Sequence, residues 1–350
     1  MAAPRTLVPD KTLRTLVSDI FAAAGTSREH ADTIADVLVW ANLRDIDSHG
    51  VSRVPRYLEL FEKGQANPKP TIAVDELRSA VAIVDADAAP GPVALSLAMD
   101  QAVSMARSAG VAWVTVRGTV HTGTIGYYTE AAARYGMAGL GIVAGVPNMA
   151  YVGTTSAGVA TSPLSVAIPA GRHPTVLLDM ATSVIALGRI AEHRAKGTPL
   201  PEGAALTKDG RPTTDPAEAA LPLPVGGAKG AGMSLVFELL ASGLAANPIV
   251  SSYHSGTPEG RRHRQNAVLV AVDISAFVPV ERFRGIVDET VDAIKALPPS
   301  DPDRELLVPG ERGARTYAER LTSGVPLPVP LVAKLVGHAR ALGAPVPEGL

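Results

Sequence analysis

The sequence predicts an α/β fold that opens with an all-helical segment and lacks a Rossmann motif. Over roughly the first 60 residues, apolar positions recur with helical spacing. From residue 80 onward, short aliphatic runs rich in β-branched residues alternate with longer helix-like runs, as in a sheet covered by helices. The glycine pattern that comes nearest to a dinucleotide-binding fingerprint, at residues 139–144, lies inside one of the aliphatic runs.

Two amphipathic helices are expected first, separated by Gly25-Thr26-Ser27, where Ser27 has the side chain of an N-cap. Residues 43–60 are expected to be largely helical as well. The inward-facing residues of the first two helices are apolar: Leu13, Val17, Ile20, Phe21, Ala31, Ile34, Val37 and Leu38. The composition changes at Asn67-Pro68-Lys69-Pro70, so we expect a domain boundary near residue 76.

The central part of the chain is expected to form one sheet. Its strands are predicted at residues 80–84, 111–116, 140–143, 164–168, 176–178 and 268–272. Helices are predicted at residues 93–109 and 127–135, and again at 233–244, 280–297 and 326–343. Two regions dense in proline, glycine and polar residues, 195–224 and 247–266, are expected to be loops.

The composition indicates a globular enzyme that acts on a small molecule. Of 350 residues, 46% are hydrophobic, and the formal net charge of −2 gives no basic field for nucleic acid. There is no cysteine, which excludes disulfides, thiolate metal sites and cysteine nucleophiles. Charged residues interrupt residues 1–20, and no long uncharged apolar run follows, so we expect a cytoplasmic protein without signal peptide or membrane span.

The tetrapeptide Asp47-Ser48-His49-Gly50, followed by Arg53, is the first candidate for chemistry. On a helix, His49 and Arg53 would be neighbours, because positions i and i+4 adjoin. The histidine could then move a proton while the arginine holds a substrate carboxylate. Alternatively, His49 satisfies a helix end and Arg53 is a solvated surface charge.

Several familiar motifs are absent. Residues 139–144 match G-x-G-x-x-A, but the fingerprint needs its glycines in a turn that opens a helix, with an acid about twenty residues on. Residues 226–232 lack the G-K-[ST] ending of a phosphate-binding loop, and G-x-S-x-G does not occur. The eight histidines are scattered singly, so no metal site is expected.

Three further residues stand where ligands often bind. His121 follows a predicted strand and precedes a helix, where strand ends and helix N-termini face a ligand, although it could merely hydrogen-bond within its loop. Asp179 ends a predicted strand and could orient a histidine or accept a ribose hydroxyl; it could equally cap the segment 181–190. Lys229 could meet a phosphate or be solvated.

Taken in order, five segments resemble the malate/L-lactate dehydrogenase family, whose members lack a Rossmann fold and include ureidoglycolate and sulfolactate dehydrogenases, diketogulonate reductase and Δ1-piperideine-2-carboxylate reductases. The matching segments are residues 47–53, His121-Thr122-Gly123 with Gly126-Tyr127-Tyr128, Asp179-Met180-Ala181-Thr182-Ser183, Lys229-Gly230-Ala231-Gly232-Met233 and Pro309-Gly310-Glu311-Arg312. Each is weak alone. Together they span nearly the whole chain in the family's order.

The resemblance implies a mostly antiparallel central sheet that is flanked by helices. It also implies an enzyme that depends on NAD or NADP, and we favour NAD. It implies a homodimer with a helical substrate and dimerisation domain, residues 1–76 plus 281–350, and a dinucleotide-binding sheet domain, residues 77–280. His49 would donate or accept the proton, Ser48 and Asp179 would form a relay that orients it, and Arg53 would bind the carboxylate. Residues implied to meet the cofactor are His121, Thr122, Gly123, Thr124, Ile125, Asp179, Met180, Ala181, Thr182, Ser183, Ala228, Lys229, Pro309, Gly310 and Glu311. In some relatives the histidine at His121 has the acid–base role.

Three functions remain open at this point. The first is reduction of a 2-oxo acid, or oxidation of the 2-hydroxy acid, with a nicotinamide cofactor. The second is reduction of a cyclic ketimine on the same scaffold, and the third is a non-catalytic binding protein. Residues 118–123 resemble the ureidoglycolate branch more than the lactate/malate branch, and residues 251–266 are long and basic. Both differences lie where substrate choice could be set.

Overall fold

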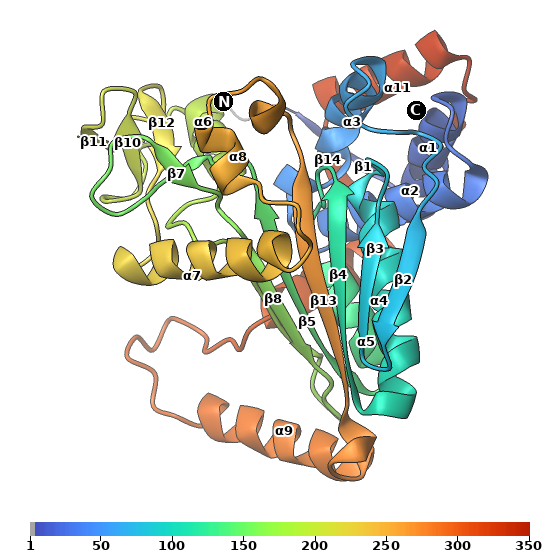
Figure 1. The fold of residues 1–350 in the computed structure, drawn as a ribbon, viewed down its shortest axis with the longest axis vertical. Coiled ribbons are helices and arrows are strands. Elements are labelled where there is room, and N and C mark those ends of the chain that lie inside the picture. The colour runs from blue at the N-terminus through green and yellow to red at the C-terminus, as the bar shows by residue number, and fades with distance from the viewer. Residues whose placement is uncertain (1–3) are drawn as a thin grey trace.

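A seven-stranded sheet forms the centre of the molecule in the computed structural model, which describes residues 4–350 (Figure 1). The strand order is β2-β3-β4-β13-β5-β8-β9. The strands are β2 (Ala73–Arg78), β3 (Val81–Asp85), β4 (Val111–Thr119), β13 (Gln265–Asp273), β5 (Met137–Gly145), β8 (Leu164–Ile168) and β9 (Val176–Met180). Residues 139–144 thus lie within β5, as their apolar context predicts.

The sheet is mixed, and this corrects the expectation of a mostly antiparallel sheet in one respect. β3 and β4 pair in parallel through the crossover helix α4 (Gly91–Ala109), whereas the other five pairings are antiparallel. A parallel pair needs a long connection, which α4 supplies. The predicted boundary near residue 76 falls inside β2, which pairs with β3.

Helices cover both faces of the sheet. α4 and α5 (Gly126–Arg134) pack on one face, where small α4 residues such as Ala98 and Ala102 lie against Val114 and Leu269 in a fully buried core. The other face packs Ile142 and Val268 against the helix α7 (Ala228–Glu238) and the π-helical turn Leu239–Gly243 that continues it. Alternate residues of β5 and β13 serve the two faces, because side chains alternate along a strand.

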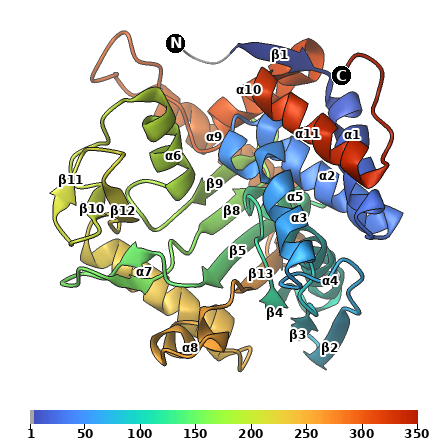
Figure 2. The ribbon, with the colours of Figure 1, turned by 90° about the horizontal axis from the view of Figure 1, so that it is seen from above.

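The N- and C-terminal segments share a second core. Helices α1 (Asp10–Ala23), α2 (Arg28–Leu43) and α11 (Val329–Leu342) pack together, and strand β1 (Arg5–Val8) pairs with β14 (Val325–Pro328) (Figure 2). The first two helices and the Ser27 N-cap were predicted, and Ser27 Oγ accepts from the His30 N–H. The helix predicted at 326–343 begins instead at Val329, because the preceding residues pair with β1.

The predicted helix over residues 43–60 is broken. Two 3-10 turns, Asp47–His49 and Val51–Arg53, precede the helix α3 (Val54–Glu62). The break is at Gly50, whose backbone is extended (ψ −152°). A Cβ at Gly50 would lie 2.1 Å from Asn42 Oδ1, so the close approach of the turn to α2 requires glycine.

Other elements surround the sheet. The helix α9 (Val280–Lys295) begins beside Gly136 at the start of β5 and is tied to the 171–173 turn through Asp288 (Figure 1). The remaining strands are β6 (Met149–Ala150), β7 (Ala157–Val159), β10 (Ala205–Thr207), β11 (Pro212–Thr213) and β12 (Ala219–Pro222). The remaining helices are α6 (Leu187–Lys196), α8 (Val250–His254) and α10 (Glu311–Ser323). Among the described residues, no helix combines the length and apolarity that a membrane span requires.

Candidate active site

The two 3-10 turns are held between α2 and α10. Asn42 Nδ2 donates to Asp47 Oδ1 at 2.8 Å, and Asn42 Oδ1 accepts from the Val51 N–H at 2.8 Å. Arg320 of α10 donates to the Asn42 carbonyl and pairs with Asp45 at 2.6 Å. These polar side-chain contacts fix the turns that carry Ser48, His49 and Arg53, in addition to the turns' own backbone hydrogen bonds.

His49 is paired with a second imidazole. Its ring stacks against His121 with centroids 5.6 Å apart and an interplanar angle of 23°. Ser48 Oγ lies 3.0 Å from His49 Nδ1, so the serine can orient the ring in either protonation state by turning its hydroxyl. Burial, and secondarily the charge of Arg53, lower the pKa of His49 to about 4, so His49 is neutral at pH 7.

His121 is held more tightly than His49. The Gly123 N–H donates to His121 Nδ1 at 3.2 Å, and the hydroxyl of the buried Tyr57 lies 2.9 Å from the same nitrogen and donates to the His121 carbonyl at 2.9 Å. Burial first, then His49 and Arg53, hold the pKa of His121 well below its usual value. Because a backbone N–H only donates, this geometry favours a bare Nδ1 and a proton on Nε2.

Arg53 contributes an uncompensated charge beside the two rings. Its Nε donates to the Ser48 carbonyl, which fixes the side chain, and within residues 4–350 no carboxylate lies within ion-pair distance of it. By contrast, the neighbouring Arg56 pairs with Glu59 at 2.7 Å. A half-buried guanidinium without an acid partner is suited to binding an anionic ligand.

Asp179 does not contact His49, which corrects the relay implied by the resemblance. Its Oδ2 accepts from Thr124 Oγ1 at 2.7 Å and from the Gly126 N–H at 2.8 Å, at the start of α5. Burial raises the pKa of Asp179, and these two hydrogen bonds oppose the rise. Asp179 thus stabilises the N-terminus of α5 from β9, and it does not cap the segment 181–190 either, since α6 starts at Leu187.

The 121–125 loop lies beside a pocket of about 230 Å³ that the sequence did not indicate. Gln265 Oε1 accepts from the Thr122 N–H at 2.8 Å, and Gln265 lines this pocket together with His263. Asn148, Thr161 and Ser162 are among the other polar residues that line it. The Ile125 side chain, expected to meet the cofactor, is buried in the core beneath α4, so only its backbone is available there.

Two of the segments expected to line the cofactor lie together. The Val225 N–H donates to the Thr182 carbonyl at 2.9 Å, and Ser183 bridges to Pro224, so residues 182–183 adjoin the glycine turn that opens α7. Ala228 and Lys229 begin this helix and are exposed, and no side chain caps it. The Thr182 hydroxyl is buried, and no other described residue forms a hydrogen bond with it.

The 309–311 segment lies against β9. The Leu177 N–H donates to the Pro309 carbonyl at 3.0 Å, and Arg44 donates to the Gly310 carbonyl at 3.1 Å. The Glu311 carboxylate is engaged within the protein: burial opposes its ionisation, but Lys295, the Val308 N–H and Arg315 outweigh this and lower the pKa of Glu311 to about 2. Its side chain is therefore committed to this ion-pair cluster.

The contacts that sequence reasoning missed come mostly from distant segments. Tyr57 gave no signal beyond its apolar context, although it follows Arg53 by one helical turn. His263 and Gln265 lie in the basic stretch 251–266, which the sequence singled out without indicating either residue. No group of three or more His, Asp or Glu side chains in residues 4–350 is arranged to hold a metal ion. The candidate site thus combines the stacked imidazoles of His49 and His121, the guanidinium of Arg53 and the neighbouring pocket.

Comparison with known proteins places this arrangement in a family. The profile described as malate/L-lactate dehydrogenase matches residues 8–336. The chain belongs to this family. An L-sulfolactate dehydrogenase of Methanocaldococcus jannaschii is 36% identical over 87% of this chain and 88% of its own length, and a ureidoglycolate dehydrogenase (NAD(+)) of Escherichia coli O157:H7 is 34% identical over 86% of each chain.

Solved structures agree with this family assignment. A sulfolactate dehydrogenase structure from M. jannaschii matches with a TM-score of 0.88 at 34% identity, covering 97% of this chain and 98% of the other. A Δ1-piperideine-2-carboxylate reductase from Pseudomonas syringae matches with a TM-score of 0.84 at 27% identity, covering 95% and 100%. The family membership makes the chain an oxidoreductase of the dehydrogenase type and disfavours the reading of a non-catalytic scaffold.

Proposed function

We propose that this malate/L-lactate dehydrogenase family member transfers a hydride between NAD or NADP and a small 2-oxo acid or 2-hydroxy acid. The observation that carries the proposal is the stacked pair of His49 and His121 beside the uncompensated guanidinium of Arg53. A carbonyl that accepts a hydride gains charge on oxygen and needs a proton, which an imidazole can supply and recover. The carboxylate beside that carbonyl needs a cation.

Arg53 binds the substrate carboxylate in this proposal. The guanidinium is held through its Nε, which leaves its terminal nitrogens free to form two parallel hydrogen bonds with an anion. An anion at this position also offsets the positive charge that lowers the pKa of His49. Substrate binding therefore raises the pKa of His49, which prepares it to carry a proton.

His49 moves the proton, and His121 stays neutral. Protonation of His49 at Nδ1 is accommodated by Ser48, whose hydroxyl can turn and accept. Protonation of His121 at Nδ1 would instead set an N–H against the Gly123 N–H. With Nδ1 bare, His121 offers its Nε2–H as a fixed donor that positions the substrate or cofactor.

The residues at the start of α7 fit a nicotinamide dinucleotide without a Rossmann motif. When bound, the cofactor supplies or accepts the hydride. The uncapped N-terminus of α7 and the exposed Lys229 suit its phosphates, and the buried hydroxyl of Thr182, which lacks a partner, can accept or donate a hydrogen bond there. Met180 and Ala181, which are partly exposed, supply further surface on the same segment, whereas Ser183 is buried and its hydroxyl donates to the Ile185 carbonyl. We favour NAD, the cofactor named for the ureidoglycolate dehydrogenase of E. coli.

A cyclic ketimine is the second candidate substrate, favoured by the structural match to a Δ1-piperideine-2-carboxylate reductase. An imine carbon accepts a hydride as a carbonyl does, but a protonated imine needs no proton during transfer. His49 would then matter less, whereas Arg53 would serve the carboxylate of either substrate. Among 2-hydroxy acids, the names of the relatives point to sulfolactate, malate and ureidoglycolate.

A homodimer in the cytoplasm completes the proposal. Leu235, Val236, Leu239 and Leu244, on α7 and the turn after it, expose between 37% and 59% of their surface, an apolar face that a second copy could cover. The helical segments 1–76 and 281–350 would serve the substrate and the dimer, and residues 77–280 the dinucleotide. Residues 1–3 lie outside the described part of the chain.

Incubation with NADH or NADPH and a panel of 2-oxo acids and cyclic imines, followed at the nicotinamide absorbance band, tests the proposal. We expect oxidation of the cofactor with at least one 2-oxo acid and a large loss of that activity in the His49→Ala variant. Full retention of every 2-oxo acid activity in His49→Ala would refute the ketone mechanism. Turnover of imines alone would establish the second candidate.

A further inference from the structure

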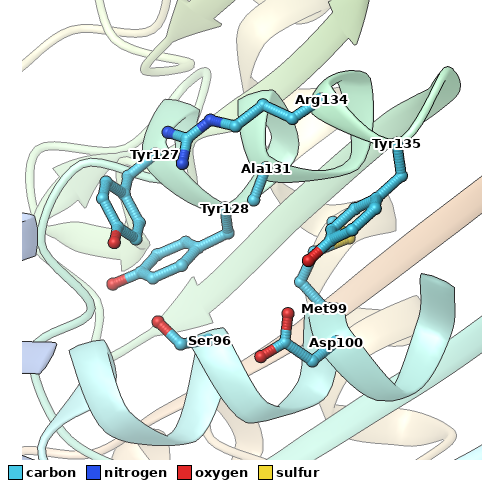
Figure 3. A pocket seen from close by; sticks show the side chains of 8 residues that line it. All are labelled: Ser96, Met99, Asp100, Tyr127, Tyr128, Ala131, Arg134 and Tyr135. Carbon is cyan, nitrogen blue, oxygen red and sulfur yellow. The ribbon is translucent and has the colours of Figure 1, made fainter. Parts of the chain in front are cut away.

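A second pocket lies between α4 and α5, on the sheet face opposite α7, with a volume of about 310 Å³ (Figure 3). It is separate from the pocket beside the 121–125 loop and shares no lining residue with it. Its lining residues are Ser96, Met99 and Asp100 of α4, Tyr127, Tyr128, Ala131 and Arg134 of α5, and Tyr135 directly after α5.

The walls carry opposite charges. Figure 3 shows Asp100 on α4 and Arg134 on α5 on opposite sides, with Tyr128 between them and Tyr127 and Tyr135 to either side. Asp100 forms no hydrogen bond or ion pair within residues 4–350, and partial burial raises the pKa of its carboxyl group. The nearest acid to Arg134 is Glu130, whose carboxylate lies 3.9 Å away. Asp100 is therefore unpaired, and Arg134, whose ion pair with Glu130 is long, can also meet a ligand.

The space between the charges is apolar and aromatic. Met99 and Ala131 contribute apolar surface, and three tyrosine rings surround it. The Ser96 hydroxyl, which lines the pocket from the α4 side, is buried and has no hydrogen-bond partner among residues 4–350. A buried polar group without a partner costs free energy, so this hydroxyl marks a place for a donor or acceptor from a ligand.

We propose that this pocket binds a small zwitterion, an α-amino acid with an apolar side chain. Its ammonium group pairs with Asp100, its carboxylate pairs with Arg134, and its side chain packs among the tyrosine rings. A simple cation would be repelled by Arg134 and a simple anion by Asp100. The volume lies at the lower end of the range for small-molecule sites and is too small for a dinucleotide.

The pocket touches the candidate active site through one side chain. The hydroxyl of the fully buried Tyr128 donates to the Thr122 carbonyl at 2.6 Å. Tyr127, which packs edge-on against Tyr128, also packs edge-on against Trp40 of α2. A bound amino acid therefore contacts a residue that holds the loop following His121, without occupying the site where the hydroxy acid would bind.

Calorimetric titration of the full chain with L-phenylalanine and with L-leucine tests this proposal, and it needs no cofactor or turnover. We expect saturable binding of at least one of them with one site per chain. Asp100→Asn and Arg134→Gln should each weaken that binding about tenfold or more, since each removes a charge-assisted hydrogen bond. Asp209→Asn is the matched control, because Asp209 lies in an exposed turn beside Arg211, and this variant should bind as the wild type does.

Ligand analogues test the same contacts without any change to the protein. N-Acetyl-L-phenylalanine lacks the ammonium charge and L-phenylalaninamide lacks the carboxylate, so each should bind about tenfold more weakly or worse. The proposal is overturned if neither amino acid binds at its solubility limit, if both charge variants bind like the wild type, or if the two analogues bind as well as the parent. None of these outcomes depends on the dehydrogenase activity.

Discussion

Replacement of Arg53 by glutamine should cost most of the binding energy for the substrate carboxylate. The guanidinium has no acid partner within the described residues, so its loss leaves no buried acid unpaired; the one hydrogen bond lost inside the protein is that from Nε to the Ser48 carbonyl. A hydrogen bond to a charged group contributes about 1.5–3 kcal/mol. This corresponds to a fall of roughly ten- to more than a hundredfold in kcat/KM.

The Arg53→Gln substitution should also raise the pKa of His49. After burial, Arg53 is the cause that lowers the pKa of His49 to about 4. Without this charge the pKa of His49 rises toward its usual value. Oxidation of a 2-hydroxy acid needs neutral His49 as the base, so the acid limb of kcat/KM should shift to higher pH in the Arg53→Gln variant.

Steady-state kinetics with a turned-over 2-oxo acid, and with its 2-hydroxy acid across pH, measure both effects. Arg56→Gln is the matched control, because Arg56 follows three residues after Arg53 and is already paired with Glu59. It should keep kcat/KM within about threefold, in line with an exposed ion pair. A change in Arg53→Gln no larger than that of Arg56→Gln, or an unmoved acid limb, would refute the assignment of Arg53.

Three further substitutions test the supports of the site. Asp179→Asn should keep kcat and change the free energy of unfolding by no more than about 1 kcal/mol, because the amide oxygen can still accept from Thr124 and the Gly126 N–H. A fall in kcat beyond about a hundredfold would instead support a relay from Asp179 to His49. Gly50→Ala should destabilise by about 1–3 kcal/mol, since its Cβ would meet Asn42 Oδ1, whereas Gly285→Ala, in open space, should not; equal unfolding midpoints would contradict this. Glu311→Gln should reduce the loss of stability between about pH 5 and pH 2. Because the pKa of Glu311 is lowered, its stabilisation is present above the usual pKa of 4.5 and is lost on acidification. An acid unfolding curve that is unchanged from the wild type would count against the ion-pair cluster of Glu311, Lys295 and Arg315.

Local patterns predicted the helices and strands that depend on neighbours in sequence. Helical periodicity predicted the inward faces of α1 and α2, and burial in the core confirms them. Short aliphatic runs predicted the strands β4 and β13 and placed residues 139–144 within a strand, as the structure has them. Elements set by distant partners were missed. β14 exists because it pairs with β1 across the length of the chain, and the helix through His49 breaks because Gly50 meets Asn42.

The site was predicted only as far as its residues have distinctive chemistry. His49, Arg53 and His121 stand out as titratable or charged groups near strand or helix ends, and the structure brings them together. The residues that hold these three side chains in place do not stand out in the sequence. Gln265 reaches Thr122 from 143 residues further along the chain. Tyr57 has the sequence context of a core residue, and only the structure shows its hydroxyl beside His121. Asp179 shows the converse, since a strand-end acid proved to hold a helix N-terminus.

The pH dependence of kcat/KM for oxidation of the 2-hydroxy acid, compared between His49→Gln and His121→Gln, tests the central claim most directly. The claim is that His49 moves the proton while the Gly123 N–H keeps His121 neutral. The acid limb of the wild type should therefore persist in His121→Gln, at reduced activity, and disappear in His49→Gln. An acid limb that persists in His49→Gln and disappears in His121→Gln would assign the proton to His121 and contradict the account.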